Sequence, residues 1–312
     1  MAEAERRLLI LGDGKPGHEN QALAFARHLN YDYDLVPVAL TQRWAKGASY
    51  VLDRLGFYSK GLFRVDLPQR NYRAVVSAGS GTYYANKVLA RQLGCPSVAI
   101  MLPRGYRYNF DLIIAQDHDR PPQRANILSL PINLTWVEPQ NLWTPPSGEH
   151  CIALIIGGDS AHGDLDVNLL RRRLEQIQQL FPAYRLWLTT SRRTPATVEQ
   201  MLREFNFDRA VFYSQEQTNP IPDMLQQCEY VFLTADSSSM ISEAVSFGKS
   251  CVEILATQEN LAAGGKIRKM IDTLEVKNCL HFFDGHCGRK QVKLQLGDLL
   301  RTRAKTSLGI VE

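Results

Sequence analysis

Short apolar runs rich in β-forming residues recur along this sequence, and each ends in small or polar residues that lead into a helical pattern. The pattern changes from that of a buried strand to that of a helix with one apolar face. Alternating strands and helices predict parallel, doubly wound sheets, whose ligands bind at the carboxyl ends of the strands. The expected strands lie at residues 7–12, 73–78, 96–102 and 111–115, and again at 151–156, 184–188, 210–213, 229–233 and 250–255.

The alternation is interrupted between residues 133 and 150, where prolines and polar residues replace any periodicity. Such a segment is typical of an interdomain linker. At 312 residues with 45% hydrophobic content, the chain is long enough for two domains with separate cores. We therefore expect one Rossmann-like domain at 1–140 and a second at 141–312. The basic, leucine-containing tail at 289–303 is expected to pack back on either domain, the first included.

Composition argues against several classes of protein. The net charge of +4 favours anionic ligands or an anionic membrane surface, but it is too small to indicate nucleic acid. The six cysteines are scattered, which argues for a reducing compartment and against a disulfide or zinc framework. No signal peptide is recognisable, and no apolar run reaches the roughly 20 residues that span a bilayer. These features predict a cytoplasmic protein, either free or peripheral at the inner face of the membrane.

The segment from Thr234 to Gly248 is the strongest candidate for a ligand site. An apolar run precedes it, and the residues from Asp236 to Ser239 offer N-caps for a helix that contains Glu243 in its first turns. Free N–H groups and the positive end of a helix favour an anion, so we expect a phosphate beside the serines. Glu243 would accept a hydrogen bond from a neighbouring sugar hydroxyl. The alternative is that the serines only cap the helix and Glu243 is a solvated surface residue.

A glycine-rich loop after the first strand ends in His18, at the expected start of a helix. The positive end of that helix disfavours imidazolium, so His18 is a candidate general base. The glycines match neither a Walker A loop nor a Gly-x-Gly-x-x-Gly motif. The alternative is a structural turn in which the histidine makes local hydrogen bonds.

Parallel strands should bring the loops at 12–18, 79–86, 103–108 and 116–120 to one edge of the first sheet. An acceptor bound there would contact Gly14, Lys15, Gly17, Asn20, Gly79, Ser80, Gly81, Arg104 and Tyr106. The loop at 116–120 also contains an Asp-His-Asp triplet, but three adjacent side chains cannot all reach one ion. We therefore expect no metal site.

Small loops should likewise meet at the carboxyl edge of the second sheet, with Arg192 beside them. Backbone N–H groups and one guanidinium could hold a diphosphate there. The expected nucleotide-sugar contacts are Gly157, Gly158, Ser160, Thr190, Ser191, Arg192, Asp236, Ser237, Ser238, Ser239, Met240, Glu243 and Gln258. Arg192 and Arg193 are equally compatible with ordinary surface charges.

Aromatic, aliphatic and basic residues are interleaved between Trp44 and Arg64. This mixture suits an anionic lipid surface or the surroundings of a lipid-linked substrate. The alternative is an amphipathic helix that packs its apolar side on the core and leaves its cations in water.

Two doubly wound domains that face each other across a cleft are the arrangement of the GT-B glycosyltransferases, and the sequence resembles one family of that class. It is similar to the elongated mitochondria family, which comprises glycosyltransferase-like bacterial proteins and a plant mitochondrial-fission factor. The matching segments extend over nearly the whole chain and are Gly12-Asp-Gly-Lys-Pro-Gly-His-Glu-Asn-Gln, Ser77-Ala-Gly-Ser-Gly-Thr, Pro103-Arg-Gly, Gly157-Gly-Asp-Ser and Thr234-Ala-Asp-Ser-Ser-Ser-Met-Ile-Ser-Glu-Ala.

The sequence is more distantly similar to the transferase that adds N-acetylglucosamine to the lipid-linked peptidoglycan precursor. By that resemblance His18 matches the proposed base and Glu243 the carboxylate that holds the ribose. Gly157 and Gly158 match the start of the phosphate loop in the second domain. The first glycine loop and the serine segment both differ in sequence from those of that enzyme.

These expectations combine into a metal-independent glycosyltransferase that needs no cofactor besides its nucleotide-diphosphate sugar. His18 would take a proton from the acceptor hydroxyl across a crevice shared with Glu243, while Arg192 and the serine helix stabilise the departing diphosphate. The resemblance favours a cell-surface polysaccharide or a lipid-linked glycan as acceptor. Two alternatives stay open: a nucleotide-sugar epimerase, and a non-catalytic, membrane-associated binding or recruitment protein. The sequence identifies neither the sugar, the nucleotide base, the stereochemistry nor the oligomeric state.

Overall fold

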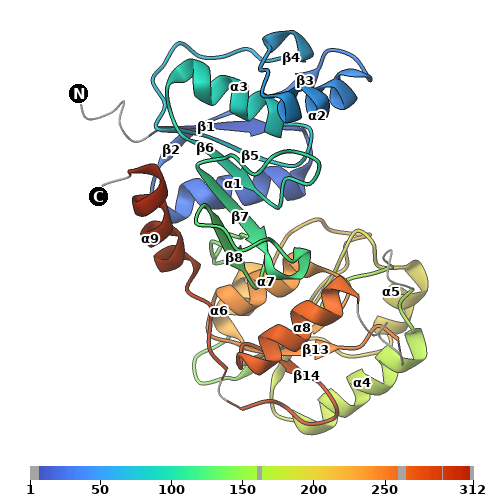
Figure 1. The fold of residues 1–312 in the computed structure, drawn as a ribbon. Helices are drawn as coiled ribbons and strands as arrows, with labels where there is room; N and C mark the ends of the chain where they lie inside the picture. Colours follow the sequence, from blue (N-terminus) through green and yellow to red (C-terminus); the bar gives the residue numbers. More distant parts are fainter. Residues whose placement is uncertain (1–6, 160–163, 259–264, 290, 310–312) are drawn as a thin grey trace. The chain divides into compact units, whose positions relative to one another are not determined.

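The structure is a computed structural model that describes residues 7–159, 164–258, 265–289 and 291–309. The chain divides into two compact units (Figure 1). Unit 1 comprises Met1–Trp136 and Gln295–Glu312, and unit 2 comprises Val137–Leu294. The division lies close to the boundary expected after residue 140, and the C-terminal helix belongs to unit 1.

Unit 1 is built on a six-stranded parallel sheet with the strand order β2-β1-β5-β6-β7-β8. Its strands are β1 (Arg7–Gly12), β2 (Asp32–Pro37), β5 (Ala74–Ala78), β6 (Ser97–Ile100), β7 (Leu112–Gln116) and β8 (Ile127–Leu130). Every residue of β5, β6 and β7 is buried, as expected for strands covered on both faces. The chain continues from β1 to β2 on one side and returns to β5 on the other. The order therefore reverses between β1 and β5.

Helices cover both faces of this sheet, with α1 (Pro16–His28) and α3 (Tyr83–Leu93) on opposite sides (Figure 1). The C-terminal helix α9 (Leu296–Leu308) packs on α1, where Arg301 donates a hydrogen bond to the carbonyl of His28. The remaining elements of unit 1 are β3 (Ala39–Leu40), α2 (Ala45–Leu55), η2 (Lys60–Leu62), β4 (Phe63–Arg64) and η3 (Asp117–Asp119). Strands β3 and β4 form a short antiparallel pair.

Unit 2 repeats the design with a parallel sheet of order β11-β10-β9-β12-β13-β14. Its strands are β9 (Cys151–Ile156), β10 (Arg185–Thr190), β11 (Arg209–Val211), β12 (Tyr230–Thr234), β13 (Cys251–Leu255) and β14 (His281–Phe282). Its helices are α4 (Val167–Leu180), α5 (Ala196–Leu202), α6 (Ile221–Gln227), α7 (Ser238–Ser246) and α8 (Lys266–Val276). Here the strand order reverses between β9 and β12.

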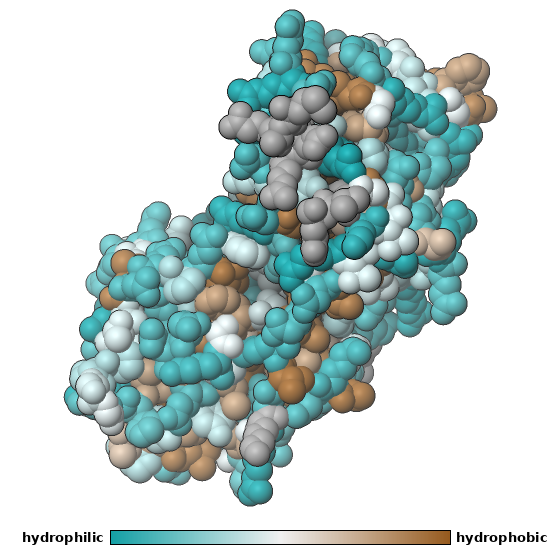
Figure 2. Space-filling model, turned by 90° about the vertical axis from the view of Figure 1, so that its left-hand side faces the viewer, coloured by the Kyte–Doolittle hydropathy of each residue, from teal (hydrophilic) through white to brown (hydrophobic). Residues whose placement is uncertain are grey.

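Each sheet has its own apolar core, centred on Leu9 and Val75 in unit 1 and on Leu154 and Phe232 in unit 2. Hydrophilic residues predominate on the face drawn in Figure 2, with apolar residues scattered between them. Several large apolar side chains nevertheless stay exposed on or beside α2. Helix α2 still packs Ala45, Ala48 and Leu52 on the core and leaves its cations exposed, so the alternative of an amphipathic helix on the core is confirmed in part.

Two differences from the sequence prediction have simple causes. The edge strands β2, β8 and β14 were not predicted, because an edge strand is short or half exposed and gives no apolar run. Helix α1 begins at Pro16, inside the expected glycine loop, because proline suits the first turn of a helix.

In the linker, the amides of residues 140–143 all donate to the carboxylate of Asp223, which holds this segment on unit 2.

Candidate functional site

The candidate site of unit 1 lies where the order of its sheet reverses, at the carboxyl ends of β1 and β5. The loop after β1 and the loop after β5 pack directly on each other. A Cβ atom on Gly79 would lie 2.2 Å from Nδ1 of His18, and one on Gly81 would lie 3.6 Å from Cβ of Asp13. Gly79 also has a φ of +87°, which only glycine adopts readily. This is the position at which doubly wound sheets bind ligands.

Asp13 holds the imidazole of His18 in place. Nδ1 of His18 lies 2.9 and 3.1 Å from the two carboxylate oxygens of Asp13, and both side chains are largely buried. An ionised carboxylate only accepts hydrogen bonds, so Nδ1 carries the hydrogen and Nε2 is the acceptor of the neutral ring. Within the described residues, Nε2 has no hydrogen-bond partner. Sequence reasoning gave Asp13 no role, although an acid in the same loop as the histidine was a usable signal.

The two other loops of unit 1 join the same edge. The hydroxyl of Tyr106 donates a hydrogen bond of 3.0 Å to the carbonyl of Ser80, and Arg104 forms an ion pair of 2.9 Å with Asp119. Burial raises the pKa of Tyr106 to about 12, so its hydroxyl remains a donor near neutral pH. The expected convergence of the four loops is therefore observed.

The other predicted acceptor residues surround the start of α1. Gly14 donates its amide to Glu19, and the carbonyl of Gly17 accepts from Gln21, so both contribute to the shape of the loop. Nζ of Lys15 is exposed and lies 3.7 Å from a carboxylate oxygen of Asp13. Asn20 is exposed on the first turns of α1. Lys15 and Asn20 are thus the side chains of this group that stand in solvent.

The candidate site of unit 2 also lies where its sheet order reverses, at the carboxyl ends of β9 and β12. Gly157 donates its amide to the hydroxyl of Thr234 at 2.7 Å, and Gly158 donates to Asp236 at 3.2 Å. A Cβ atom on Gly157 would lie 2.0 Å from Asp236, and one on Gly158 would lie 1.9 Å from the carbonyl oxygen of Arg193. Both glycines thus allow close packing of the loops. The expectation that their N–H groups are free for a diphosphate is wrong, because Thr234 and Asp236 accept both.

Arg193, rather than Arg192, is joined to this loop cluster. Its guanidinium donates to Asp236 at 2.7 Å and to the carbonyl of Asp159 at 3.1 Å, and part of it stays exposed. Arg192 instead lines a cavity of about 330 Å³ between α5 and the end of β11, together with Tyr213. The sequence could not separate two adjacent arginines, because only the loop conformation decides which one turns inward.

The hydroxyl groups of Thr190 and Ser191 form hydrogen bonds mainly to other residues of unit 2. The hydroxyl of Thr190 donates to Glu199 at 2.6 Å and accepts from the amide of Tyr213 at 2.8 Å. The hydroxyl of Ser191 accepts from the amide of Arg193 at 3.2 Å. These residues therefore shape the loop beside the cavity.

Helix α7 begins with the expected serine cap and contains a carboxyl group that is partly buried. Ser237 is the N-cap and accepts from the amide of Met240, Ser238 is the first residue of the helix, and Ser239 is exposed. Glu243 lies in the second turn, and burial alone raises its pKa from 4.5 to about 7. The alternative of a solvated surface glutamate is therefore wrong. A buried carboxyl group without a compensating partner is a common feature of binding sites.

Two other predictions concern neighbouring segments. Gln258 donates a hydrogen bond of 3.1 Å to the carbonyl of Asp164, at the surface of unit 2. Ser160 lies outside the described residues. Within the ranges that the structure describes, no group of three or more histidine, cysteine, aspartate or glutamate side chains could hold a metal ion. None of the helices in those ranges is long and apolar enough to cross a membrane.

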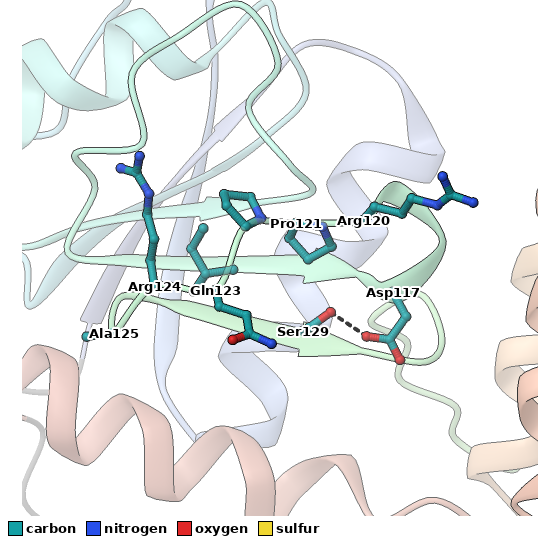
Figure 3. Close-up of a pocket in the computed structure, with 9 residues that line it drawn as sticks. Asp117, Arg120, Pro121, Gln123, Arg124, Ala125 and Ser129 are labelled. Carbon is teal, nitrogen blue, oxygen red and sulfur yellow. Dashed lines mark hydrogen bonds between the residues drawn. The ribbon is translucent and has the colours of Figure 1, made fainter.

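A separate cavity of about 680 Å³ lies in unit 1 beside the loop that joins β7 to β8 (Figure 3). Its lining is Asp117, Arg120, Pro121, Pro122, Gln123, Arg124, Ala125, Ile127 and Ser129. Figure 3 shows Asp117 hydrogen-bonded to Ser129, while Arg120 and Arg124 point away from each other. None of the predicted acceptor residues lines this cavity.

Comparisons with known proteins agree with this architecture. The sequence profile of the mitochondrial fission ELM1 family matches residues 16–302. Uncharacterized protein RP120 of Rickettsia prowazekii (strain Madrid E) is 30% identical over 103 residues, which cover 31% of this chain and 29% of that protein. The match to this curated relative thus spans less than a third of its length.

Two solved structures are similar to the chain over nearly its whole length. One is S. aureus MnaA with UDP, which has a TM-score of 0.50 and 10% identity and covers 98% of both chains. The other is a Listeria monocytogenes protein with the provisional name UDP-N-acetylglucosamine 2-epimerase. Its TM-score is 0.51 at 10% identity, and the match covers 99% of this chain and 98% of that one. The two units, each with a six-stranded parallel sheet, are those of the GT-B fold.

Proposed function

Because the chain belongs to the mitochondrial fission ELM1 family and has the GT-B fold, we propose that it is a glycosyltransferase. It moves a sugar from a nucleotide-diphosphate sugar to a hydroxyl of a cell-surface polysaccharide or a lipid-linked glycan. The observation that carries this proposal is the Asp13–His18 pair, which leaves Nε2 of a partly buried imidazole as a proton acceptor at the reversal point of the unit 1 sheet. Such a group is suited to deprotonate a hydroxyl nucleophile.

In this proposal unit 2 binds the donor. The start of α7 at Ser238 and Ser239 offers backbone N–H groups and the positive end of a helix dipole to the diphosphate. Arg193 supplies a guanidinium whose remaining donors face solvent, and it takes the place we expected for Arg192. The carboxylate of Glu243 accepts hydrogen bonds from the ribose. These hydrogen bonds would offset the cost of its burial.

The transfer step follows from these groups. The acceptor oxygen attacks the anomeric carbon as its proton moves to Nε2 of His18, and the bond from that carbon to the diphosphate breaks. The developing imidazolium is stabilised by the carboxylate of Asp13. The guanidinium and the helix end stabilise the diphosphate as it leaves, so the mechanism uses no metal ion.

We place the protein in the cytoplasm, at the inner face of a membrane where lipid-linked acceptors are available. Its six cysteines are free thiols, which supports a reducing compartment.

The test separates donor binding from transfer in the full-length protein. Nucleotide-diphosphate sugars are screened by thermal shift, because a bound ligand raises the unfolding temperature. We expect a shift that is lost in Glu243→Ala and kept in His18→Gln and in the exposed control Glu204→Gln. When a panel of acceptors is added, we expect the parent and Glu204→Gln to transfer sugar and His18→Gln to bind the donor without transferring it.

Other outcomes overturn the proposal. The proposed donor site is contradicted if no nucleotide or nucleotide sugar changes the unfolding temperature. It is also contradicted if Glu243→Ala binds the nucleotide sugar as tightly as the parent does. Conversion of the donor without any acceptor identifies an epimerase. Binding of a nucleotide sugar without turnover across the panel identifies a binding or recruitment protein.

A further inference from the structure

Helix α2 packs Ala45, Ala48 and Leu52 on the core but leaves its largest apolar side chains exposed. Trp44, Val51 and Leu55 lie along one side at helical spacing and are 65%, 56% and 64% exposed, and Phe57 just after the helix is 65% exposed. The opposite side, with Ala45, Ser49 and Asp53 at intervals of four residues, is completely buried. A surface helix normally buries its apolar side and exposes its polar side.

The buried polar side of α2 has a structural explanation, because it holds the loop that carries Tyr106. Ser49 is hydrogen-bonded to the hydroxyl of Tyr106 at 2.9 Å. Asp53 accepts from the amide of Arg107 and from Nζ of Lys87, both at 2.7 Å. These hydrogen bonds offset the burial of a hydroxyl and a carboxylate. The fold therefore accounts for the inner side of α2, but in the part of the chain that the structure describes nothing covers the exposed apolar side chains.

The segment that carries this exposed side has mostly positive exposed charges. The exposed cations of the segment 43–66 are Arg43, Lys46, Arg54, Lys60 and Arg64. The only exposed acid among these described residues is Asp66, since Asp53 is buried and paired with Lys87. Apolar and aromatic side chains bordered by lysine and arginine match the chemistry of a bilayer interface with anionic headgroups. A symmetric contact with a second copy would bring the same cations together, which is unfavourable.

We propose that this α2 face, defined as Trp44, Val51, Leu55 and Phe57 with the five surrounding cations, docks unit 1 on an anionic lipid bilayer. The apolar side chains enter the interfacial layer, where tryptophan is favoured, and the cations contact the headgroups. The docking itself does not depend on catalysis. One consequence rests on the proposed function: because α2 holds the Tyr106 loop, docking would bring the acceptor edge of unit 1 close to a lipid-linked acceptor.

The test is vesicle flotation with the full-length protein in the absence of nucleotide sugar. We expect binding to phosphatidylcholine vesicles that contain phosphatidylglycerol, little binding to phosphatidylcholine alone, and release by salt. The double variant Arg43→Gln/Arg54→Gln should weaken binding about fivefold for each cation removed. Leu55→Ser/Phe57→Ser should also weaken it. The matched control, Lys269→Gln/Val276→Ser, removes an exposed cation and an exposed apolar residue from α8 of unit 2 and should bind as the parent does.

The docking proposal is overturned if the parent does not bind anionic vesicles, or if the α2 variants bind them as well as the parent while their thermal unfolding is unchanged. It is also overturned if the parent is a dimer that the α2 variants convert to monomers without any vesicle binding, since a second copy then covers the face. Donor binding is measured without vesicles, so the failure of one proposal is distinguishable from the failure of the other.

Discussion

Replacing Glu243 by glutamine is expected to stabilise the folded protein while it weakens donor binding. In the folded state, burial raises the pKa of this carboxyl group from 4.5 to about 7, and no counter-charge or hydrogen bond from the residues that the structure describes reduces the effect. That difference corresponds to a loss of about 3 kcal/mol in the free energy of unfolding when the group is ionised. Glutamine has nearly the same shape and no charge, so it avoids this cost.

The sign of the pH dependence follows from the raised pKa. Below pH 4.5 the group is protonated in both the folded and the unfolded chain, and the substitution changes little. As the pH rises to about 7, the unfolded chain ionises first, so the parent loses stability relative to the glutamine variant. Above that pH the difference is constant, at up to about 3 kcal/mol. For a domain the size of unit 2 this is a shift of roughly 6–12 °C in unfolding temperature.

The assay compares thermal unfolding of the parent, Glu243→Gln and the exposed control Glu204→Gln near pH 4.5 and above pH 7. A titration with nucleotide sugar accompanies it. We expect only the first variant to gain stability at the higher pH and to lose affinity for the donor. A Glu243→Gln variant that is equally stable or less stable above pH 7 would refute the reasoning. Its carboxylate would then have partners that compensate its burial, and it would not be held ready for a ligand.

The remaining predictions concern binding and the two loops of unit 1. Hydrogen bonds from the donor favour the ionised form of Glu243, so donor affinity measured by calorimetry should rise with pH up to about 7 and level off above it; a flat profile contradicts this role. Asp13→Asn should lower kcat by roughly 10²–10⁴-fold in a transfer assay with little change in donor binding. The exposed control Asp32→Asn should leave kcat unchanged. If Asp13→Asn is as fast as the parent, the imidazole needs no orienting carboxylate. Gly94→Ala should cost about 1–2 kcal/mol in unfolding experiments because this glycine has a positive φ, with no change in activity. Gly79→Ala, whose new Cβ would also meet the imidazole of His18, should cost more and lose activity.

The sequence was sufficient for the doubly wound architecture, because buried parallel strands leave continuous apolar runs. It also located the two loop clusters, since parallel strands bring their carboxyl ends to one edge. It could not identify the partners of the residues in those clusters. By resemblance Gly157 and Gly158 match the start of a phosphate loop, yet their amides donate to Thr234 and Asp236. Which N–H group meets which acceptor depends on loop conformation, and residue spacing does not determine that.

At two positions the sequence also could not show whether a side chain points into the protein or toward solvent. Arg192 and Arg193 are indistinguishable in sequence, and only the turn after β10 directs Arg193 to Asp236. Helix α2 has an ordinary amphipathic pattern, but Ser49 and Asp53 hold the Tyr106 loop and are buried beside Ala45, which leaves the apolar side chains of Val51 and Leu55 exposed. In both cases a tertiary contact overrides the local pattern.

The contrast between Asp236 and Glu243 shows how the structure separates a structural carboxylate from a candidate ligand-binding one. Asp236 accepts hydrogen bonds from Gly158, Thr234 and Arg193, so the fold fully offsets its burial. Glu243 is partly buried a short distance along the chain, and its raised pKa has desolvation as its only cause. A fold retains such a cost when something outside the fold compensates it. The same argument applies to the exposed apolar side of α2. Both proposals start from an energetic cost, the desolvation of a carboxylate or the exposure of apolar surface to water, that no contact within the described residues offsets.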